Sequence, residues 1–232
     1  MTDRLVVAVV VFPGSNDDHD AAWALGAVGA EPELVWHQES ALPSDTAAVV
    51  LPGGFSYGDY LRTGAIASVA PVMAAVAEFA ARGGPVLGIC NGFQILCEAR
   101  LLPGVLRSNR QLEFVCRDAT VRVESTDSVF LRRCAPEQEL VIPIKHGDGA
   151  WYADQGTLVQ LAARGQIVLR YVDDVNGSLG NVAGVVNEAG NVMGLMPHPE
   201  HAVDPLLGSA DGGLLLAAVV DAASAHRTPT PA

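Results

Sequence analysis

Uninterrupted apolar runs recur in the first half of the chain, and polar or glycine-containing stretches separate them. The runs Leu5–Phe12, Ala47–Leu51 and Pro85–Ile89 contain no charged side chain. A strand with one solvated face alternates apolar and polar residues, whereas a continuous apolar run indicates a strand that is covered on both faces. The pattern therefore predicts the buried strands of a parallel sheet.

The segments between these runs have the composition of helices. Ser15 or Asn16 can cap a helix that starts at Asp18, where acidic residues suit the positive end of the helix dipole. Pro71 marks a break or a fresh start in an alanine-rich stretch. The expected elements are helices at Asp18–Val28, Ile66–Ala81 and Gly92–Ala99 and a short strand at Glu33–Trp36. This alternation predicts parallel strands with helices on both faces.

Past Pro103 the pattern changes to short alternating segments. They predict strands at Glu113–Glu124, Gln166–Tyr171, Val182–Asn187 and Val192–Met196, followed by a helix near Gly213–Ala223. The predicted fold class is α/β, an open and mainly parallel twisted sheet flanked by helices, with additional mixed or antiparallel strands in the C-terminal half. One domain is expected over residues 1–226, with a loose C-terminal tail at residues 227–232.

Composition and charge exclude several classes of function for the chain. The formal net charge of −12 argues against nucleic acid or an anionic membrane surface as a partner. The first apolar run is too short to cross a bilayer. The four cysteines form no CxxC pair and no disulfide framework, so reduced thiols and a cytoplasmic location are expected. Three of them are expected to have no function: Cys97, Cys116 and Cys134.

The stretch Gly88-Ile89-Cys90-Asn91-Gly92 follows an apolar strand and enters a predicted helix. A strand, a tight turn at a nucleophile and a helix make up a nucleophile elbow, which lifts the reactive side chain clear of the backbone. Small flanking residues leave room for a substrate. The first amides and the positive end of the helix favour the thiolate of Cys90.

A base and a group that orients it occur together in Pro197-His198-Pro199-Glu200. The prolines predict an extended segment, in which residues two apart point to the same side. Glu200 can then accept the ring N–H of His198 and leave the other ring nitrogen for Cys90. The order of nucleophile, histidine and acid disfavours an α/β-hydrolase, in which the acid precedes the histidine. A rigid surface loop with solvated charges is the alternative interpretation.

These motifs resemble the Cys-His-Glu triad of the class I glutamine amidotransferases, a flavodoxin-like fold. Within that class, further stretches resemble the separate glutaminase subunits of phosphoribosylformylglycinamidine synthase. Those stretches are Leu51–Tyr60, Phe93 after the elbow, Pro143–Gly149 and Leu207–Gly212. The resemblance spans about Leu5 to Ala223. His201 departs from it, because arginine is expected there in many relatives.

The resemblance, together with the chemistry of the residues, implies a role for each. Cys90 would attack the side-chain amide of L-glutamine, and His198 would protonate the departing ammonia and activate the water that hydrolyses the glutamyl thioester. Glu200 would orient His198. The backbone N–H groups of Gly54 and Asn91 would bind the oxyanion. Two further residues are expected at the substrate: Gln94 and His146.

The resemblance also implies partners. A large ATP-dependent synthetase subunit and a small bridging subunit would use the ammonia to convert formylglycinamide ribonucleotide to formylglycinamidine ribonucleotide in purine synthesis. ATP and magnesium are expected on that synthetase. The chain itself has no phosphate-binding glycine loop, and we expect no cofactor, no metal, no nucleic acid and no membrane partner. The isolated chain is expected to be a weak glutaminase whose rate rises in the complex.

Two other functions are compatible with parts of the sequence. The first is a stand-alone hydrolase of γ-glutamyl amides with the same triad, which assays with γ-glutamyl peptides would distinguish. The second is a flavodoxin-like binding module, in which the glycine loops hold a phosphate and Cys90 is incidental. Labelling by a diazo-ketone analogue of glutamine separates the enzyme from the module, although the module leaves Pro197–Glu200 unexplained.

Overall fold

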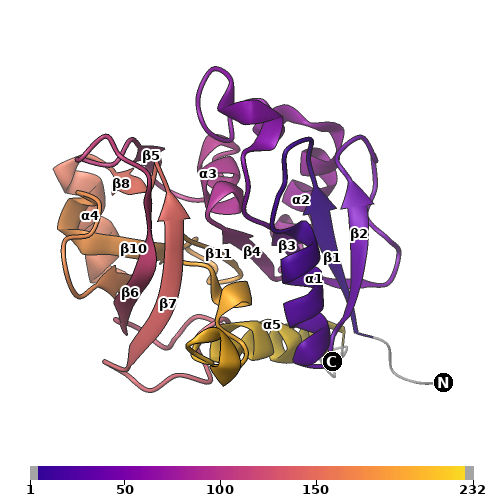
Figure 1. The fold of residues 1–232 in the computed structure, drawn as a ribbon. Coiled ribbons are helices and arrows are strands. Elements are labelled where there is room, and N and C mark those ends of the chain that lie inside the picture. Colours follow the sequence, from indigo (N-terminus) through magenta and orange to yellow (C-terminus); the bar gives the residue numbers. More distant parts are fainter. Residues whose placement is uncertain (1–4, 228–232) are drawn as a thin grey trace.

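A computed structural model describes residues 5–227 of the chain, and nine of its strands form one sheet (Figure 1). The strand order is β2-β1-β3-β4-β11-β10-β9-β6-β7. The pairs from β2 to β11 are parallel, and the pairs from β11 to β7 are antiparallel. The predicted class, a mainly parallel sheet joined to antiparallel strands, is confirmed.

The parallel half of the sheet is built from short apolar strands. Its members are β1 (Val6–Val11), β2 (Glu31–Trp36), β3 (Thr46–Leu51), β4 (Val86–Ile89) and β11 (Val192–Leu195). Nearly every residue of β1, β3, β4 and β11 is buried, as continuous apolar runs predict. The last of these strands in sequence, β11, pairs directly with β4, and Leu195 lies beside Ile89.

Apart from β11, which belongs to the parallel half, the later strands of the large sheet form its antiparallel half. They are β10 (Val182–Val186), β9 (Ile167–Tyr171), β6 (Val115–Val123) and β7 (Glu139–His146). A separate two-stranded sheet joins β5 (Val105–Arg107) to β8 (Ala150–Tyr152). Strand β7 was not predicted, although buried and exposed residues alternate along it. Pro143 lies within it and removes a ladder donor, which is tolerated because β7 is an edge strand.

Helices cover both faces of the parallel half. Helices α1 (Asp18–Ala27) and α5 (Gly212–Arg227) pack against each other on one face, and α2 (Pro71–Ala81) and α3 (Asn91–Glu98) lie on the other (Figure 1). Pro71 is the first residue of α2, so it begins a helix afresh after a single 3₁₀ turn. Helix α4 (Gln155–Ala163) was not predicted, because only Leu161 of its residues is buried.

Two expectations about helix ends need correction. Neither Ser15 nor Asn16 caps α1, because Asp17 occupies the N-cap position and Ser15 Oγ accepts a hydrogen bond from Phe12 instead. The final helix extends to Arg227, which was expected to begin a loose tail. The rest of that tail lies outside the described residues. Within residues 5–227, the helices are all too short or too polar to cross a bilayer.

Candidate active site

Cys90 lies between strand β4 and helix α3, where the chain turns sharply. It is the N-cap residue of α3, with φ 49° and ψ −102°. A positive φ is rare for a residue with a side chain, and strained positions of this kind cluster at functional sites. The side chain is almost fully buried, and its Sγ lies 3.8 Å from the backbone oxygen of Lys145. The backbone therefore has the geometry predicted for a nucleophile elbow.

The glycines on either side of this turn serve helix packing. A Cβ added to Gly92 would lie 2.0 Å from the backbone oxygen of Leu51 on β3, and one added to Gly88 would lie 2.6 Å from Cδ1 of Leu96 on α3. The sequence analysis assigned both glycines to making room for a substrate. Their physical role is instead the close approach of α3 to strands β3 and β4, which fixes the height of Cys90 above the sheet.

His198 and Glu200 follow strand β11, and both are buried. Residues Pro199–His201 form a single 3₁₀ turn, η4, so the extended segment expected from the two prolines is wrong. The pair nevertheless meets, because Nδ1 of His198 lies 2.6 Å from Oε1 of Glu200. The backbone N–H of His198 donates to the oxygen of Pro143 on β7 at 2.8 Å.

The pairing of β4 with β11 brings these groups into one pocket. The N–H of Cys90 donates to the oxygen of Leu195 at the end of β11, and both Cys90 and His198 line the pocket. Burial lowers the pKa of His198, but the carboxylate of Glu200 and the sulfur of Cys90, by charge and hydrogen bonding, outweigh it and raise the pKa to about 10. The imidazole is therefore set up to hold a proton beside the sulfur.

The four other predicted site residues reach the same pocket or its wall. Gly54, Gln94 and His146 line it, and Asn91 is buried at the start of α3. The side-chain amide of Gln94 is fixed at both ends, since Nε2 donates to the oxygen of Asp148 and Oε1 accepts from Asn91. Gln94 is therefore buried, and its side chain is fixed in the pocket wall.

Two backbone amides near Cys90 are available to an oxyanion. Among the described residues, the N–H groups of Gly54 and Asn91 donate to no backbone or side-chain acceptor. Asn91 begins α3, where the first amides have no partner within the helix. Gly54 has φ +143°, a conformation that favours glycine. The loop that carries Gly54 is fixed by the chain before α1, because the backbone N–H groups of Asn16 and Asp17 donate to the oxygen of Gly53.

His146 is a buried, neutral neighbour of the pair. Its Nδ1 lies 3.1 Å from Oδ1 of Asn109, and its Nε2 is buried without a hydrogen bond among the described residues. Burial and the charge of His198 lower the pKa of His146 to about 4. His146 therefore offers an uncharged ring to the pocket at neutral pH.

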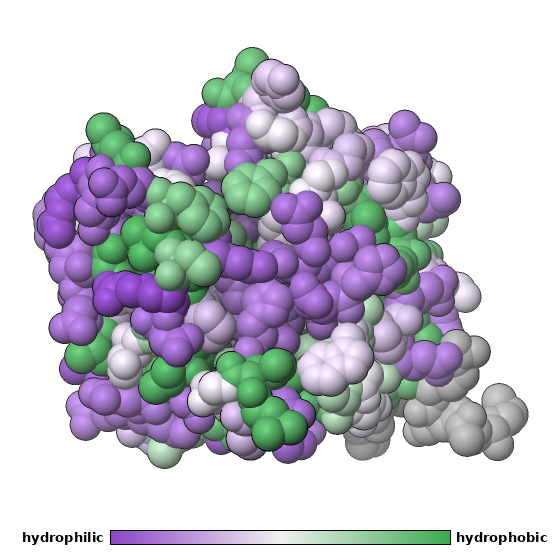
Figure 2. Space-filling model, in the orientation of Figure 1, coloured by the Kyte–Doolittle hydropathy of each residue, from purple (hydrophilic) through white to green (hydrophobic). Residues whose placement is uncertain are grey.

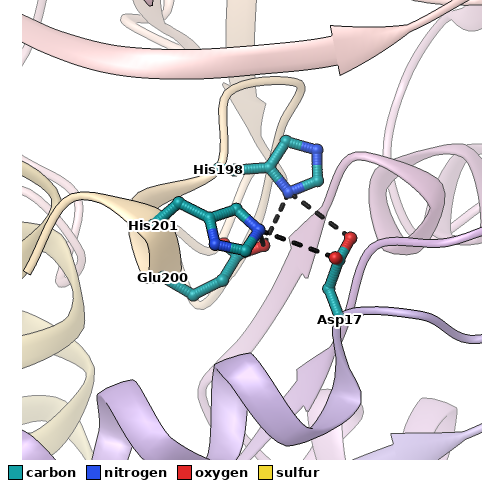
Figure 3. Close-up of side chains that lie close together, drawn as sticks. All are labelled: Asp17, His198, Glu200 and His201. Atoms are coloured by element: carbon teal, nitrogen blue, oxygen red, sulfur yellow. Dashed lines mark hydrogen bonds and ion pairs between the residues drawn. The ribbon is translucent and has the colours of Figure 1, made fainter. Parts of the chain in front are cut away.

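Three groups that the sequence analysis gave no role lie beside the predicted pair. Asp17 is buried, with Oδ2 3.6 Å from Nδ1 of His198 (Figure 3). Its Oδ1 lies 2.5 Å from Nζ of Lys145. His201 Nε2 lies 3.5 Å from Oδ1 of Asp17. Burial would raise the pKa of Asp17, but these neighbouring cations and hydrogen bonds hold it well below its ordinary value. No local pattern signals Asp17, since its partners are distant in the sequence.

This cluster also has the composition of a metal site. Donor atoms of four side chains lie within 4.8 Å of one another: Asp17, His198, Glu200 and His201. Lys145 already neutralises Asp17, and Glu200 already pairs with His198. Ion pairs thus account for the arrangement, and the expectation that the chain binds no metal stays a prediction.

The pocket is also lined by the acidic pair Asp59 and Asp148. Burial and the charge of Asp148 raise the pKa of Asp59 to about 6, and Oδ1 of Asp59 is buried without a hydrogen bond among the described residues. On the face of the molecule toward the viewer, hydrophilic residues gather in the middle with hydrophobic ones at the borders (Figure 2). The aromatic rings of Phe55 and Phe114, also in the pocket wall, are partly exposed.

Comparison with known proteins identifies the family. Residues 4–211 match the CobB/CobQ-like glutamine amidotransferase domain. The chain is 56% identical to phosphoribosylformylglycinamidine synthase subunit PurQ of Rubrobacter xylanophilus, over 92% of this chain and 97% of the relative. It is 51% identical to the same subunit of Helicobacter hepaticus, over 90% and 95% of the two chains.

A solved structure agrees with these sequences. One chain in the structure of PurLQS from Thermotoga maritima has a TM-score of 0.86 and 44% identity, covering 93% of this chain and 97% of that one. A glutamine amidotransferase of Thermotoga maritima, 19% identical with a TM-score of 0.62, shares the fold. The chain belongs to the family of glutamine amidotransferase subunits of phosphoribosylformylglycinamidine synthase.

Proposed function

We propose that the chain hydrolyses L-glutamine to glutamate and ammonia through a triad of Cys90, His198 and Glu200. The thiolate of Cys90 attacks the amide carbon, and the amides of Gly54 and Asn91 bind the oxyanion. His198 gives its proton to the leaving nitrogen, and ammonia departs as the glutamyl thioester forms. His198 then takes a proton from water, which attacks the thioester and releases glutamate and the free thiol.

One observation carries this proposal: the strained Cys90 turn and His198, which is paired with the buried Glu200, line a single pocket. A base that holds its proton at neutral pH matches the first step, which needs a thiolate and an acid for the leaving ammonia. The 2.6 Å contact to Glu200 orients the ring, so its other nitrogen is free for the reacting atoms.

The size and the charges of the pocket suit an amino acid that carries an amide. Gln94 lies one helical turn beyond Cys90, a rise of about 5.4 Å, and holds the backbone of Asp148 there. Glutamine spans a similar distance between its amide carbon and its α-ammonium. We therefore place the α-ammonium against Asp59 and Asp148, where an unpaired carboxylate oxygen lacks a donor.

The family supports a use for the ammonia. The relatives are named as subunits of phosphoribosylformylglycinamidine synthase, and the solved relative comes from a PurLQS structure. We propose that this chain supplies ammonia to a large ATP-dependent synthetase, with a small bridging subunit, for the conversion of formylglycinamide to formylglycinamidine ribonucleotide. ATP and magnesium would bind the synthetase. The cytoplasmic location also stays a prediction.

Replacing the nucleophile tests the chemistry. In Cys90→Ser, ammonia release by the assembled complex should fall by at least about 10³-fold, since an alcohol is a far weaker nucleophile than a thiolate. A diazo-ketone analogue of glutamine should label the parent once and the variant not at all. Cys116→Ser, at an exposed cysteine, is the matched control. Normal ammonia release by Cys90→Ser would refute the triad.

Adding the synthetase and bridging subunits to the isolated chain tests the coupling. We expect weak ammonia release from the chain alone and a clear rise in the complex. An isolated chain that is already fully active, and that hydrolyses γ-glutamyl peptides as fast as glutamine, would favour the stand-alone hydrolase instead.

A further inference from the structure

Asp17 is a buried carboxylate that does not serve its own helix. It stands at the N-cap of α1, but its side chain accepts no hydrogen bond from the helix amides. An N-cap aspartate ordinarily accepts such a bond and gains about 1 kcal/mol from it. Here the carboxylate turns toward the catalytic pair instead (Figure 3). Its orientation is therefore set by contacts outside the helix.

The carboxylate of Asp17 and the imidazole of His198 both pack against Gly53, on the loop after β3. A Cβ added to Gly53 would lie 2.4 Å from Oδ2 of Asp17 and 2.6 Å from Cε1 of His198. The amide of Asp17 donates to the oxygen of the same glycine at 3.3 Å. Asp17 and His198 thus pack directly over Gly53, in space that no other residue type would leave open.

Two carboxylates face the same ring nitrogen. Nδ1 of His198 carries one hydrogen, and Oε1 of Glu200 at 2.6 Å is the acceptor. Oδ2 of Asp17 lies farther away, at 3.6 Å, so it acts on the ring through its charge. An opposite charge at such a distance favours the protonated imidazole.

Lys145 connects this carboxylate to the nucleophile side of the pocket. Its Nζ binds Oδ1 of Asp17 at 2.5 Å, and its backbone oxygen lies 3.8 Å from Sγ of Cys90. The lysine side chain is about one-third exposed, whereas that of Asp17 is 4% exposed. Lys145 therefore supplies the counter-charge that a buried second carboxylate requires.

We propose that Asp17, held by Lys145, is a second positioning carboxylate that keeps the protonated imidazole of His198 facing Cys90. This inference rests on the proposed triad chemistry. The groups that face the imidazole, or the carboxylate beside it, are Asp17 from the start of α1, Cys90 from the elbow, Lys145 and His146 from β7, and Glu200 and His201 from η4. Removing the negative charge and removing the positive charge should have opposite effects on the ring.

The test compares Asp17→Asn and Lys145→Met in the assembled complex, by the pH profile of kcat/KM for glutamine. Asp17→Asn should lower kcat about tenfold with little change in KM. The basic limb of the pH profile, which reports loss of the proton from His198, should move to lower pH by about half to one unit, because an anion near the imidazole is lost. Lys145→Met should move the same limb upward, because the counter-charge is lost. Asp18→Asn, the next residue on α1, is the matched control and should leave both unchanged.

The two variants give the proposal separate ways to fail. An Asp17→Asn protein that melts like the parent, with the parent kcat and an unmoved basic limb, overturns it. If that protein does not fold, Lys145→Met decides, and a limb that stays in place or moves downward overturns the proposal as well. Asp17→Glu should recover part of the rate that Asp17→Asn loses, which is not expected if the carboxylate serves only to hold the fold. Failure of Cys90→Ser to lose activity would instead refute the triad itself.

Discussion

The carboxylate of Glu200 should account for a large part of the catalytic rate. Burial lowers the pKa of His198, yet Glu200 and Cys90 raise it from 6.5 to about 10. At about 1.36 kcal/mol per pKa unit, this rise corresponds to roughly 5 kcal/mol in favour of the imidazolium. Glu200 is the larger of the two sources, so at least half of the rise, about 2.5 kcal/mol or more, disappears in Glu200→Gln. That loss corresponds to a fall in kcat on the order of 10²-fold.

The assay is ammonia release by the assembled complex as a function of pH. With the amide in place, the pKa of His198 should return toward its ordinary value, so the basic limb of the profile should move downward. Because the raised pKa of His198 stabilises the fold below pH 6.5, and this contribution is lost as the pH rises toward 10, the variant should also show a flatter stability profile in that window. Glu188→Gln, at an exposed glutamate, is the control.

A Glu200→Gln protein with the parent rate and the parent basic limb would refute this reasoning. So would a variant that loses activity only because it has lost its fold, which thermal melting of both proteins would reveal. A fall in kcat with an intact melting temperature and a moved limb is the expected combination.

Two further predictions concern the pocket walls. Asp59→Asn should raise KM for glutamine about tenfold, through loss of a charged partner for the α-ammonium, and leave kcat/KM for 4-carbamoylbutanoate, which lacks the amino group, unchanged. Equal losses for both substrates would contradict that placement. His146 has its pKa lowered to about 4, so its contribution to stability is present above pH 6.5 and lost as the pH falls toward 4. His146→Gln should therefore recover roughly 3 kcal/mol of the stability lost between pH 7 and pH 4, measured by urea unfolding at both values. If the parent and the variant lose the same stability between pH 7 and pH 4, the proposed contribution of His146 is wrong.

The sequence allowed most of the parallel half of the fold to be predicted, because β1, β3 and β4 are buried on both faces. The apolar runs Leu5–Phe12, Ala47–Leu51 and Pro85–Ile89 predict these strands directly. Strand β7 was missed, because Pro143 and Lys145 interrupt the alternation of apolar and polar residues that indicates a strand. Helix α4 was missed, because an exposed helix with one buried residue leaves almost no periodic signal.

The candidate site likewise has a part that the sequence predicted and a part that it did not. The elbow around Cys90 and the pair His198–Glu200 are local motifs, so their neighbours in sequence predict them. Asp17 and Lys145 meet only because α1 and β7 both approach η4, and a single sequence does not reveal that juxtaposition. The expectation that His198 and Glu200 meet was right for the wrong reason, since a 3₁₀ turn replaces the extended segment.

The position of β11 in the middle of the sheet has a consequence for biosynthesis. This strand is the last to be made, yet it inserts between β4 and β10 and brings His198 to the pocket of Cys90, which is translated long before. A nascent chain that has not reached Leu195 lacks both the base and the central partner of β4. With the proposed triad, ribosome-bound or truncated forms should therefore release no ammonia from glutamine until β11 has completed the sheet.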